Sequence, residues 1–346
     1  MKYGVAIIGC GDMGKIHATA WAERKDSRIL AVFDPDKARG EEMAAKYGAK
    51  YCADYRSAIE EKGVSVISVC TPVCLHREIS CFAAGAKRHI LCEKPIALTE
   101  KDADAMIKAA RENKVKLAVS YQYRGFPHYR RFQELVKNGE FGGTVFYNFV
   151  DIREVRPKPA MHSKSMNGGP VIDMAGHWFD LMRFFTGSEP KMVFANGSVF
   201  AKGKQRTAGI SDLAVDAAEI QVTMENGHVL RAFVDWGMPE GFQTMQEERL
   251  VGPSIAAWTE GGKVFVRRAE STTIFDAKPN PCGPAVRIAD LLESIETDRK
   301  PEVAGEDGRA ALRVSLAALK SIETGQVVEL QSSRFQNSEC GEVKTF

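Results

Sequence analysis

Residues 3–22 decide the fold of this chain, and they read YGVAIIGCGDMGKIHATAWA. The first six residues are mostly apolar and read as a buried strand, whereas the last ten have the spacing of a helix. The turn between them, GCGDMG, has the pattern GxGxxG. In a strand–turn–helix unit, Gly9 permits the tight turn, Gly11 lets the backbone approach a pyrophosphate, and Gly14 lets the helix pack closely on the strand. The stretch therefore predicts a dinucleotide-binding unit, in which we also expect Asp12 and Met13 to contact the cofactor.

A second predicted strand, residues 28–33, ends at Asp34, about twenty residues after Gly14, the spacing of the dinucleotide fingerprint. A carboxylate at this position accepts hydrogen bonds from ribose hydroxyls and repels a 2′-phosphate, so NAD is expected as the cofactor, with NADP disfavoured. Pro35 follows Asp34 where Arg or Ser would favour NADP, although Lys37 leaves some NADP use open. The alternative, a glycine-rich turn that binds no nucleotide, accounts less well for the complete pattern.

Strands and helices continue to alternate up to residue 120. The expected strands cover residues 3–8, 28–33, 49–52, 64–69, 89–92 and 115–120. The expected helices cover residues 13–22, 36–47, 54–61, 76–84 and 99–114, the last with Thr99 as its N-cap. Such alternation predicts right-handed βαβ units and a doubly wound parallel sheet of the Rossmann type.

The pattern changes after residue 120. We expect a helix over 127–138, a strand over 144–151, a polar stretch over 153–168 and a helix over 170–185. Residues 191–268 then show period-two strands, such as 218–224 and 228–234, with Asn226-Gly227 as a type I′ turn between these two. Two helices, 284–297 and 306–323, follow. We therefore predict two domains, a Rossmann domain over 1–121 and a substrate-binding and oligomerisation domain over 122–332. The second domain is an open, mostly antiparallel sheet with helices, and its last helix could pack back on the first domain.

The composition limits the classes of partner. The chain has 346 residues, of which 44% are hydrophobic, which is enough for two cores. Its 47 basic and 45 acidic residues leave a net charge of +2, which predicts neither a nucleic acid nor a membrane as partner. Apolar runs are strand-sized, and a signal-peptide cleavage would destroy the glycine turn, so a cytoplasmic location is expected.

The eight cysteines include no CxxC pair, and Cys70 and Cys74 have CxxxC spacing without a second pair. A zinc site is therefore a weaker interpretation than buried, reduced thiols. We expect no metal.

Three further blocks are informative in combination with the glycine turn. They are Cys70-Thr71-Pro72 with His76, Glu93-Lys94-Pro95 directly after a predicted strand, and residues 168–180, which read GGPVIDMAGHWFD. Over nearly its whole length the chain resembles the Gfo/Idh/MocA oxidoreductase family. Two residues depart from the family pattern: Asn167 stands where the first of three glycines is often found, and Ala175 stands where glycine is common.

The residues themselves suggest the chemistry. Asp173 and His177 are four residues apart, so one continuous helix would place both on one face, with Asp173 in the first turn after Gly168-Gly169-Pro170. Removal of a hydroxyl proton needs a base that titrates near neutrality, which suits His177. Lys94 follows the carboxyl end of a strand, where open α/β sheets bind ligands, and its ammonium can stabilise an alkoxide. The resemblance implies the same catalytic residues: Lys94, Asp173 and His177.

The resemblance and the loop positions add further candidates. Expected cofactor contacts beyond the glycine turn and Asp34 are Thr71, Pro72, His76, Glu93, Lys94 and Gln122. Expected substrate contacts are Lys94, Arg124, Arg153, His162, Asp173 and His177. The resemblance also implies a cis peptide bond before Pro95 and a homodimer or homotetramer.

Several positions keep two interpretations. Tyr121 and Tyr123 fit core aromatics as well as a place beside the nicotinamide. Asp180 either touches substrate or pairs with Arg183 at i+3. The polar loop with Arg153, Arg156, Lys158 and His162 either selects substrate or is a solvated surface loop. Trp236 is either a sugar-stacking face or, the better interpretation, a core residue.

Three functions fit these observations. The first is an NAD-dependent dehydrogenase of a polyol, sugar, cyclitol or glycoside. The second is a sugar-modifying enzyme in which oxidation is transient and the hydride is returned after an elimination or glycoside cleavage. The third is a non-catalytic NAD-binding regulator, against which the retention of Lys94, Asp173 and His177 argues.

Overall fold

The computed structural model describes residues 2–277 and 283–331. The first half of the chain forms sheet A, whose six strands are all parallel. Their order is β3 (Lys50–Tyr51), β2 (Ser27–Phe33), β1 (Tyr3–Ile8), β4 (Val64–Val69), β5 (His89–Cys92) and β6 (Leu117–Val119). The connecting helices are α1 (Asp12–Ala22), α2 (Lys37–Tyr47), α3 (Tyr55–Glu60), α4 (His76–Gly85) and α5 (Glu100–Glu112). The order 3-2-1-4-5-6 is that of a Rossmann fold and confirms the predicted doubly wound sheet.

Local capping explains where several of these helices begin. The side chains of Asp36, Asp54 and Thr99 each accept a hydrogen bond from the backbone N–H three residues later. A side-chain acceptor at this position satisfies one of the N–H groups that have no partner within the helix. Thr99 is thus confirmed as an N-cap.

The second half of the chain forms sheet B, a mixed sheet of nine strands. Their order is β14 (Thr272–Asp276), β13 (Lys263–Arg267), β12 (Ala256–Glu260), β11 (Met245–Val251), β7 (Phe146–Glu154), β10 (Val229–Met238), β9 (Ala217–Met224), β8 (Pro190–Ser198) and β15 (Val328–Glu329). Among the described strands of this sheet only β7 and β10 run parallel, so the expectation of an open, mostly antiparallel sheet is confirmed.

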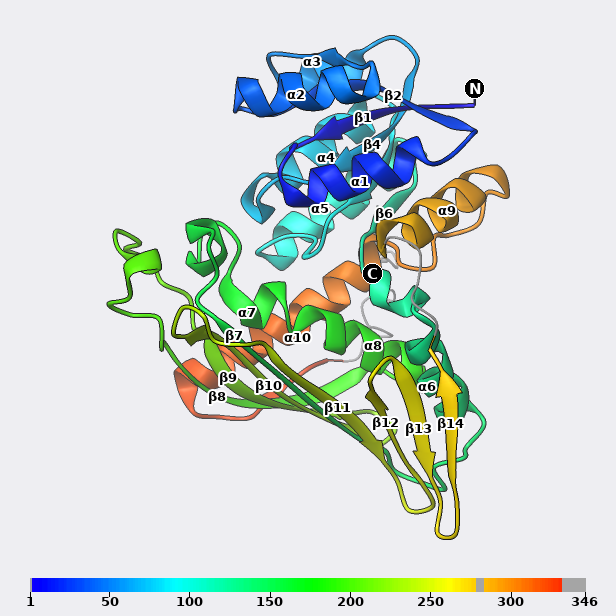
Figure 1. Ribbon diagram of the computed structural model, residues 1–346, viewed down its shortest axis with the longest axis vertical. Coiled ribbons are helices and arrows are strands. Elements are labelled where there is room, and N and C mark those ends of the chain that lie inside the picture. The colour runs from blue at the N-terminus through cyan, green and yellow to red at the C-terminus, as the bar shows by residue number, and fades with distance from the viewer. Residues whose placement is uncertain (1, 278–282, 332–346) are drawn as a thin grey trace, which may run out of the picture.

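Helices lie between the two sheets, as Figure 1 shows. The α-helices of the second half are α6 (Pro127–Lys137), α7 (Gly169–Asp173), α8 (Gly176–Thr186), α9 (Gly283–Glu296) and α10 (Gly305–Thr324). Short 3₁₀ turns are η1 (Val73–Leu75), η2 (Gln122–Gly125), η3 (Pro159–His162) and η4 (Gln205–Thr207). α8 and α10 pack on each other, and α10 also contacts β8 of sheet B.

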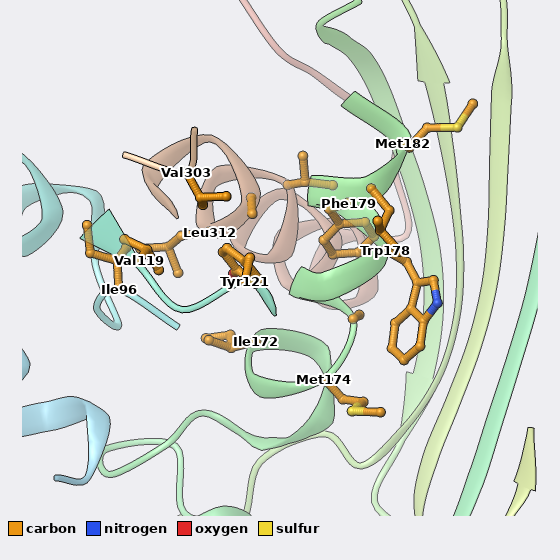
Figure 2. Close-up of a cluster of buried hydrophobic side chains, with 14 of the residues drawn as sticks. Ile96, Val119, Tyr121, Ile172, Met174, Trp178, Phe179, Met182, Val303 and Leu312 are labelled. Carbon is orange, nitrogen blue, oxygen red and sulfur yellow. The ribbon is translucent and has the colours of Figure 1, made fainter. Parts of the chain in front are cut away.

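One hydrophobic core joins the two halves. Figure 2 shows Ile96, Val119 and Tyr121 from the end of sheet A facing α10 and α8. Val119 N–H donates to the Val303 carbonyl at 2.9 Å, so the segment before α10 continues the edge of sheet A. Because apolar burial is the main stabilising contribution to such packing, the parts of the chain that carry Lys94 and His177 are held in one relative position.

The predicted helix over 170–185 is wrong in one respect, because it is broken between Asp173 and Gly176. The N–H of Ala175 reaches back to the Pro170 carbonyl, five residues away, and the N–H of His177 bonds to Met174, only three residues away. A widened turn followed by a tightened one interrupts the regular α-helical ladder. Asp173 therefore ends α7 and does not lie in the first turn of a long helix.

The turn between β9 and β10 also differs from the prediction. Gly227 has a positive φ of 86°, but Asn226 does not, whereas a type I′ turn needs both. Gly227 N–H donates to the Met224 carbonyl, and Met224 N–H donates to the His228 main-chain carbonyl. These contacts indicate a type I turn followed by a left-handed glycine, the usual three-residue hairpin.

Among residues 2–277 and 283–331, no helix combines the length and the apolar character that a membrane span requires. The same residues contain no cluster of three or more potential metal ligands. The cysteines of this part of the chain are free thiols, but Cys74 is exposed, which contradicts the expectation of burial for that residue. Cys282 and Cys340 lie outside the described residues.

Candidate active site

The glycine turn has the geometry that a bound pyrophosphate requires. Gly9 has a φ of +95°, which disfavours any residue with a side chain. A Cβ on Gly14 would lie only 1.9 Å from the Gly9 carbonyl oxygen, so α1 approaches the turn as closely as a glycine allows. A Cβ on Gly11 would meet no atom within 4 Å, so this backbone faces open space. Since the first N–H groups of a helix have no partner within it, the open side of the turn suits an anion.

Substitution of Gly14 tests the turn. We expect Gly14→Ala to weaken NAD binding at least tenfold, because the Gly9 backbone must move away from the new methyl group. The same overpacking lowers the free energy of unfolding by about 1–3 kcal/mol. Calorimetric titration with NAD and urea unfolding measure the two effects. Gly85→Ala is the matched control, because its Cβ meets no atom; unchanged NAD affinity in Gly14→Ala would contradict the assignment.

Asp34 lies buried at the end of β2 and anchors the turn. Its carboxylate accepts from the N–H of Cys10 at 2.7 Å and from the N–H of Asp36 at 2.8 Å. Arg39 donates to the same carboxylate at 2.7 Å. Burial opposes ionisation of Asp34, but Arg39 and the two backbone N–H groups lower its pKa. The sequence pattern did not single out Arg39, which lies one helical turn into α2 and partly neutralises Asp34.

Three buried side-chain oxygens at the carboxyl ends of strands have no hydrogen-bond partner among the described residues. They are Oγ1 of Thr71, after β4, and Oγ of Ser120 and Oε1 of Gln122, after β6. Pro72 follows Thr71 and precedes the short helix η1. In an open parallel sheet this edge is where ligands bind. Unsatisfied buried oxygens at this edge fit a polar cofactor that supplies the missing donors.

His76 and Glu93 instead hold the loops around this edge. The two ring nitrogens of His76 lie 2.9 Å from the Pro95 carbonyl and 3.0 Å from the Thr71 carbonyl. Glu93 lies 2.7 Å from Nε2 of His17 in α1. His76 therefore has no free ring nitrogen for a ligand, and Glu93 ties the loop after β5 to the helix of the glycine turn.

Lys94 and Asp173 come together although 79 residues separate them. The ammonium of Lys94 donates to the Asp173 carboxylate and, at 3.0 Å, to the Asp173 main-chain carbonyl. That carbonyl is available because the break after Asp173 sends the His177 N–H to Met174 instead. The peptide bond between Lys94 and Pro95 is cis.

Electrostatics keeps this lysine charged. Burial opposes the charge on Lys94, but the Asp173 carboxylate outweighs it and raises the Lys94 pKa. Asn167 bridges the pair to the first domain, because its amide donates to Asp173 at 3.4 Å and its oxygen accepts from Val73 N–H at 3.3 Å. In the sequence, Asn167 is marked only as a departure from glycine, and nothing there predicts its contact with Asp173.

His177 is almost fully buried, with 3% of its surface exposed. Its ring stacks on Tyr123, with centroids 4.1 Å apart, and meets Tyr121 edge-on at 5.3 Å. Nδ1 is buried without a hydrogen-bond partner. Burial, together with the charges of Lys94 and Arg153, lowers the His177 pKa well below its usual value. The imidazole is therefore neutral at pH 7 and can accept a proton.

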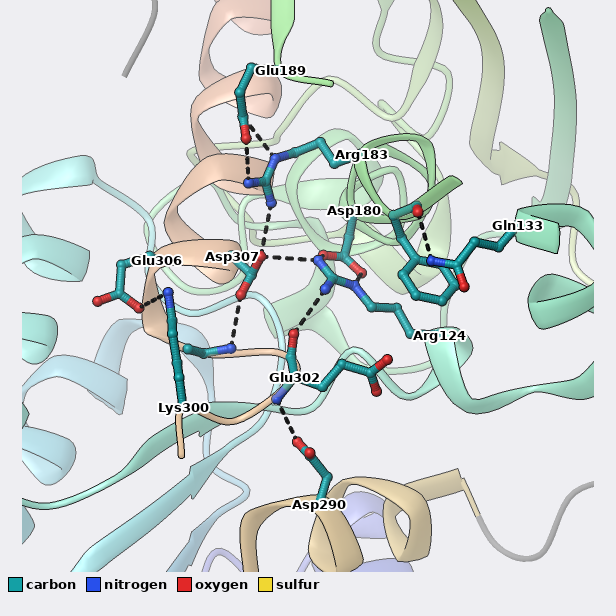
Figure 3. A network of polar contacts seen from close by, with 12 residues as sticks. Arg124, Gln133, Asp180, Arg183, Glu189, Asp290, Lys300, Glu302, Glu306 and Asp307 are labelled. Atoms are coloured by element: carbon teal, nitrogen blue, oxygen red, sulfur yellow. Dashed lines mark hydrogen bonds and ion pairs between the residues drawn. The ribbon is translucent and has the colours of Figure 1, made fainter. Parts of the chain in front are cut away.

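Arg124 and Asp180 form a buried ion pair behind His177. Nε and Nη2 of Arg124 lie 2.8 and 2.5 Å from the two Asp180 oxygens. Figure 3 shows how Arg124 also reaches Asp307 and the Glu302 carbonyl. Of the two interpretations of Asp180, pairing with Arg183 is wrong, since Arg183 binds Glu189 and Asp307 instead. The donors of Arg124 are thus engaged by the protein, which leaves it poorly placed for substrate.

The end of β7 and the polar loop after it approach both parts of the site. Arg153, which was predicted in the loop, lies within β7 because the strand runs on to Glu154. Arg153 makes a two-pronged ion pair with Asp151, at 2.6 and 2.7 Å. Lys158 pairs with Asp12 of the glycine turn at 2.5 Å, both being exposed. His162 is buried, and its Nε2 accepts from the N–H of Arg156 at 2.9 Å.

Three aromatic positions now have definite surroundings. Trp236 and Tyr121 are core residues, each with less than 3% of its surface exposed. Tyr123 is only half-buried and stacks on His177. Met13 is likewise half-buried beside the glycine turn.

Comparison with known proteins gives matches over most of the chain. A family model described as "Oxidoreductase family, NAD-binding Rossmann fold" matches residues 3–121, and one described as "GFO/IDH/MocA C-terminal domain" matches residues 129–252. The rhizopine catabolism protein MocA of Rhizobium meliloti is 31% identical over 343 residues, which cover 99% of each chain. The myo-inositol 2-dehydrogenase of Thermotoga maritima is 27% identical over 343 residues, covering 94% of this chain and 98% of its own.

Solved structures agree with the fold. The crystal structure of aldose-aldose oxidoreductase from Caulobacter crescentus has a TM-score of 0.82 and 25% identity, covering 95% of this chain and 100% of that one.

Proposed function

The chain belongs to the Gfo/Idh/MocA family of oxidoreductases, and we propose that it oxidises an alcohol carbon of a sugar, cyclitol or glycoside with NAD. The observation that carries the proposal is the ion pair of Lys94 with Asp173 within electrostatic range of a neutral His177. Two relatives support the substrate class, since one is named for myo-inositol and the other for aldoses.

Each of the three residues has a distinct role in this proposal. His177 accepts the hydroxyl proton, because its imidazole is neutral and its Nδ1 has no hydrogen-bond partner among the described residues. Lys94 donates a hydrogen bond to the same oxygen and stabilises the developing alkoxide. Asp173 keeps Lys94 charged and directs its ammonium. The roles proposed for His177 and Asp173 need no metal ion.

The cofactor half of the proposal follows from the fit of the glycine turn. Bound NAD supplies the hydride acceptor. The residues proposed to hold it are Gly9, Gly11, Asp12, Met13, Gly14, Asp34, Thr71, Pro72 and Gln122. Asp34 favours NAD over NADP, although Arg39 on the same carboxylate reduces the repulsion of a 2′-phosphate. Glu93 and His76 position the loops. Arg153, near the end of β7, and His162, in the loop after it, are proposed to select substrate.

The proposal includes a homodimer or homotetramer in the cytoplasm. On the open face of sheet B, the apolar side chains of Phe146, Met245 and Ile274 are exposed. Trp258 stacks on Phe265, which lies opposite Ile274 on the neighbouring strand. An apolar sheet face of this kind is suited to pairing subunits.

The test is a screen of cyclitols, sugars and glycosides with NAD and with NADP, in which absorbance of the reduced cofactor is followed. Steady formation of NADH supports a dehydrogenase. Product formation without net NADH would support the transient-oxidation alternative. Binding of NAD without turnover of any compound would support a regulator and contradict the proposal.

A further inference from the structure

The guanidinium of Arg156 differs from its neighbours because it has no carboxylate partner. It lies half-buried over the ring of Trp236, 6.0 Å from the centroid. Its Nε atom is covered and has no acceptor. Among residues 2–277 and 283–331, no carboxylate forms an ion pair with Arg156. Its charge is therefore partly removed from water and faces an aromatic ring in place of a counter-charge.

The arginines nearby show the usual solution. Arg153 pairs with both oxygens of Asp151, and Arg206 pairs with Glu154 and Glu240 at 3.1 Å each. A desolvated guanidinium without a counter-charge is unfavourable, whereas a carboxylate can engage its planar donors two at a time. Arg156 is the arginine of this group that has no such partner among the described residues.

Arg156 also lies within electrostatic range of the catalytic residues. Burial and the charge of Arg153 lower its pKa, whereas Glu154, Asp151 and Asp173 act in the opposite sense. Its main-chain N–H donates to His162, which fixes the loop at this point. Lys94 balances Asp173, and Asp151 balances Arg153. Arg206 takes up both Glu154 and Glu240, so Arg156 is left without a direct ion pair among the described residues although the group carries no net charge.

We propose that the substrate is a polyhydroxy acid, such as a uronic or aldonic acid, whose carboxylate pairs with Arg156. This inference rests on the proposed function, since it assumes that the hydroxyl to be oxidised lies at Lys94 and His177. A carboxylate presents two oxygens to the planar donors of a guanidinium that has no ion-pair partner among the described residues.

Binding measurements test the proposal without turnover. The protein loaded with NADH is titrated calorimetrically with D-glucuronate, D-galacturonate and D-gluconate, and with the neutral amide of each. We expect at least one acid to bind at least tenfold more tightly than its amide. Arg156→Gln should remove this difference by weakening the acid and changing the amide less than twofold. Arg156→Lys should restore part of it, because a point charge remains.

Arg249→Gln is the matched control, since Arg249 also lies over a tryptophan ring, 5.9 Å from Trp258, on the open face of sheet B. It should leave both affinities unchanged. The proposal is wrong if no acid binds better than its amide, or if Arg156→Gln weakens acid and amide equally. It is also wrong if Arg156→Gln weakens NADH itself tenfold, because the guanidinium would then serve a cofactor phosphate.

The two proposals can fail separately. NADH formation from a neutral polyol that is lost in His177→Asn supports the dehydrogenase. If acids are not preferred over that polyol, the same result contradicts the requirement for an acid. Selective acid binding that depends on Arg156, without oxidation of any compound, supports the Arg156 site and contradicts the dehydrogenase.

Discussion

His177→Asn lowers kcat for alcohol oxidation by at least 100-fold and changes the NAD dissociation constant less than twofold. The effect is large because the buried imidazole is the proposed proton acceptor, and general bases of this kind contribute about 10²–10⁴-fold. Cofactor affinity is retained because the proposed NAD contacts are all on the glycine turn and the strand ends of sheet A. Steady-state kinetics and calorimetric titration with NAD measure the two quantities.

The pH profile gives a second readout of the same residue. Since the His177 pKa is lowered, the base is present at pH 7 and is lost only as the pH falls through that lowered value. The acidic limb of kcat/KM, which reports the free enzyme, should therefore lie below about pH 6.5, the ordinary histidine pKa, and should disappear in His177→Asn.

His128→Asn is the matched control for His177. His128 is also largely buried and lies 4.0 Å from the Tyr129 ring, and burial lowers its pKa to about 4. It has no proposed part in catalysis, so its replacement should change kcat less than threefold. Equal turnover in wild type and His177→Asn would remove the catalytic assignment.

Asp180→Leu lowers the free energy of unfolding by about 3–5 kcal/mol, because it leaves the Arg124 guanidinium buried without its main counter-charge. Urea unfolding followed by circular dichroism measures the loss. The double variant Arg124→Met/Asp180→Leu should recover much of it, since a buried pair can be replaced by apolar residues at little cost. The ion pair between Arg124 and Asp307 remains in the single variant and limits the loss of unfolding free energy.

The pair also positions the site. Asp180 lies one turn after His177 on α8, and Arg124 follows Tyr123, which stacks on His177. Asp180→Leu should therefore lower kcat more than it raises KM for substrate. Arg231 and Glu219 provide the control, because this exposed pair at 2.9 Å should contribute less than about 1 kcal/mol. A stability loss in Asp180→Leu no larger than that of Glu219→Gln would contradict the buried-pair interpretation.

The Rossmann half was predictable from local sequence to within one or two residues. The strands Tyr3–Ile8, Val64–Val69 and His89–Cys92 occur at the predicted limits. Their apolar runs, the glycine turn and the capping residues all act over a few positions, so each leaves a local signal.

The break between α7 and α8 had only a weak local signal, Gly176, because a single glycine within a helical pattern is tolerated. It depends on close tertiary contact: a Cβ on Gly176 would lie 2.7 Å from the Tyr121 hydroxyl. The partners of Arg124 and Asp180 were equally hidden, because 56 residues separate them.

By itself, the sequence determined the dinucleotide-binding turn and the alternation of strands and helices in the parallel sheet, and it predicted the three side chains proposed for catalysis. Periodicity and short spacings encode such features directly. Only the tertiary structure decided that Asp173 faces Lys94, that Arg124 is taken up by Asp180, and that Arg156 lacks a carboxylate partner among the described residues. Pairing of charges depends on which distant segments the apolar core brings together, and no spacing along the chain records that choice.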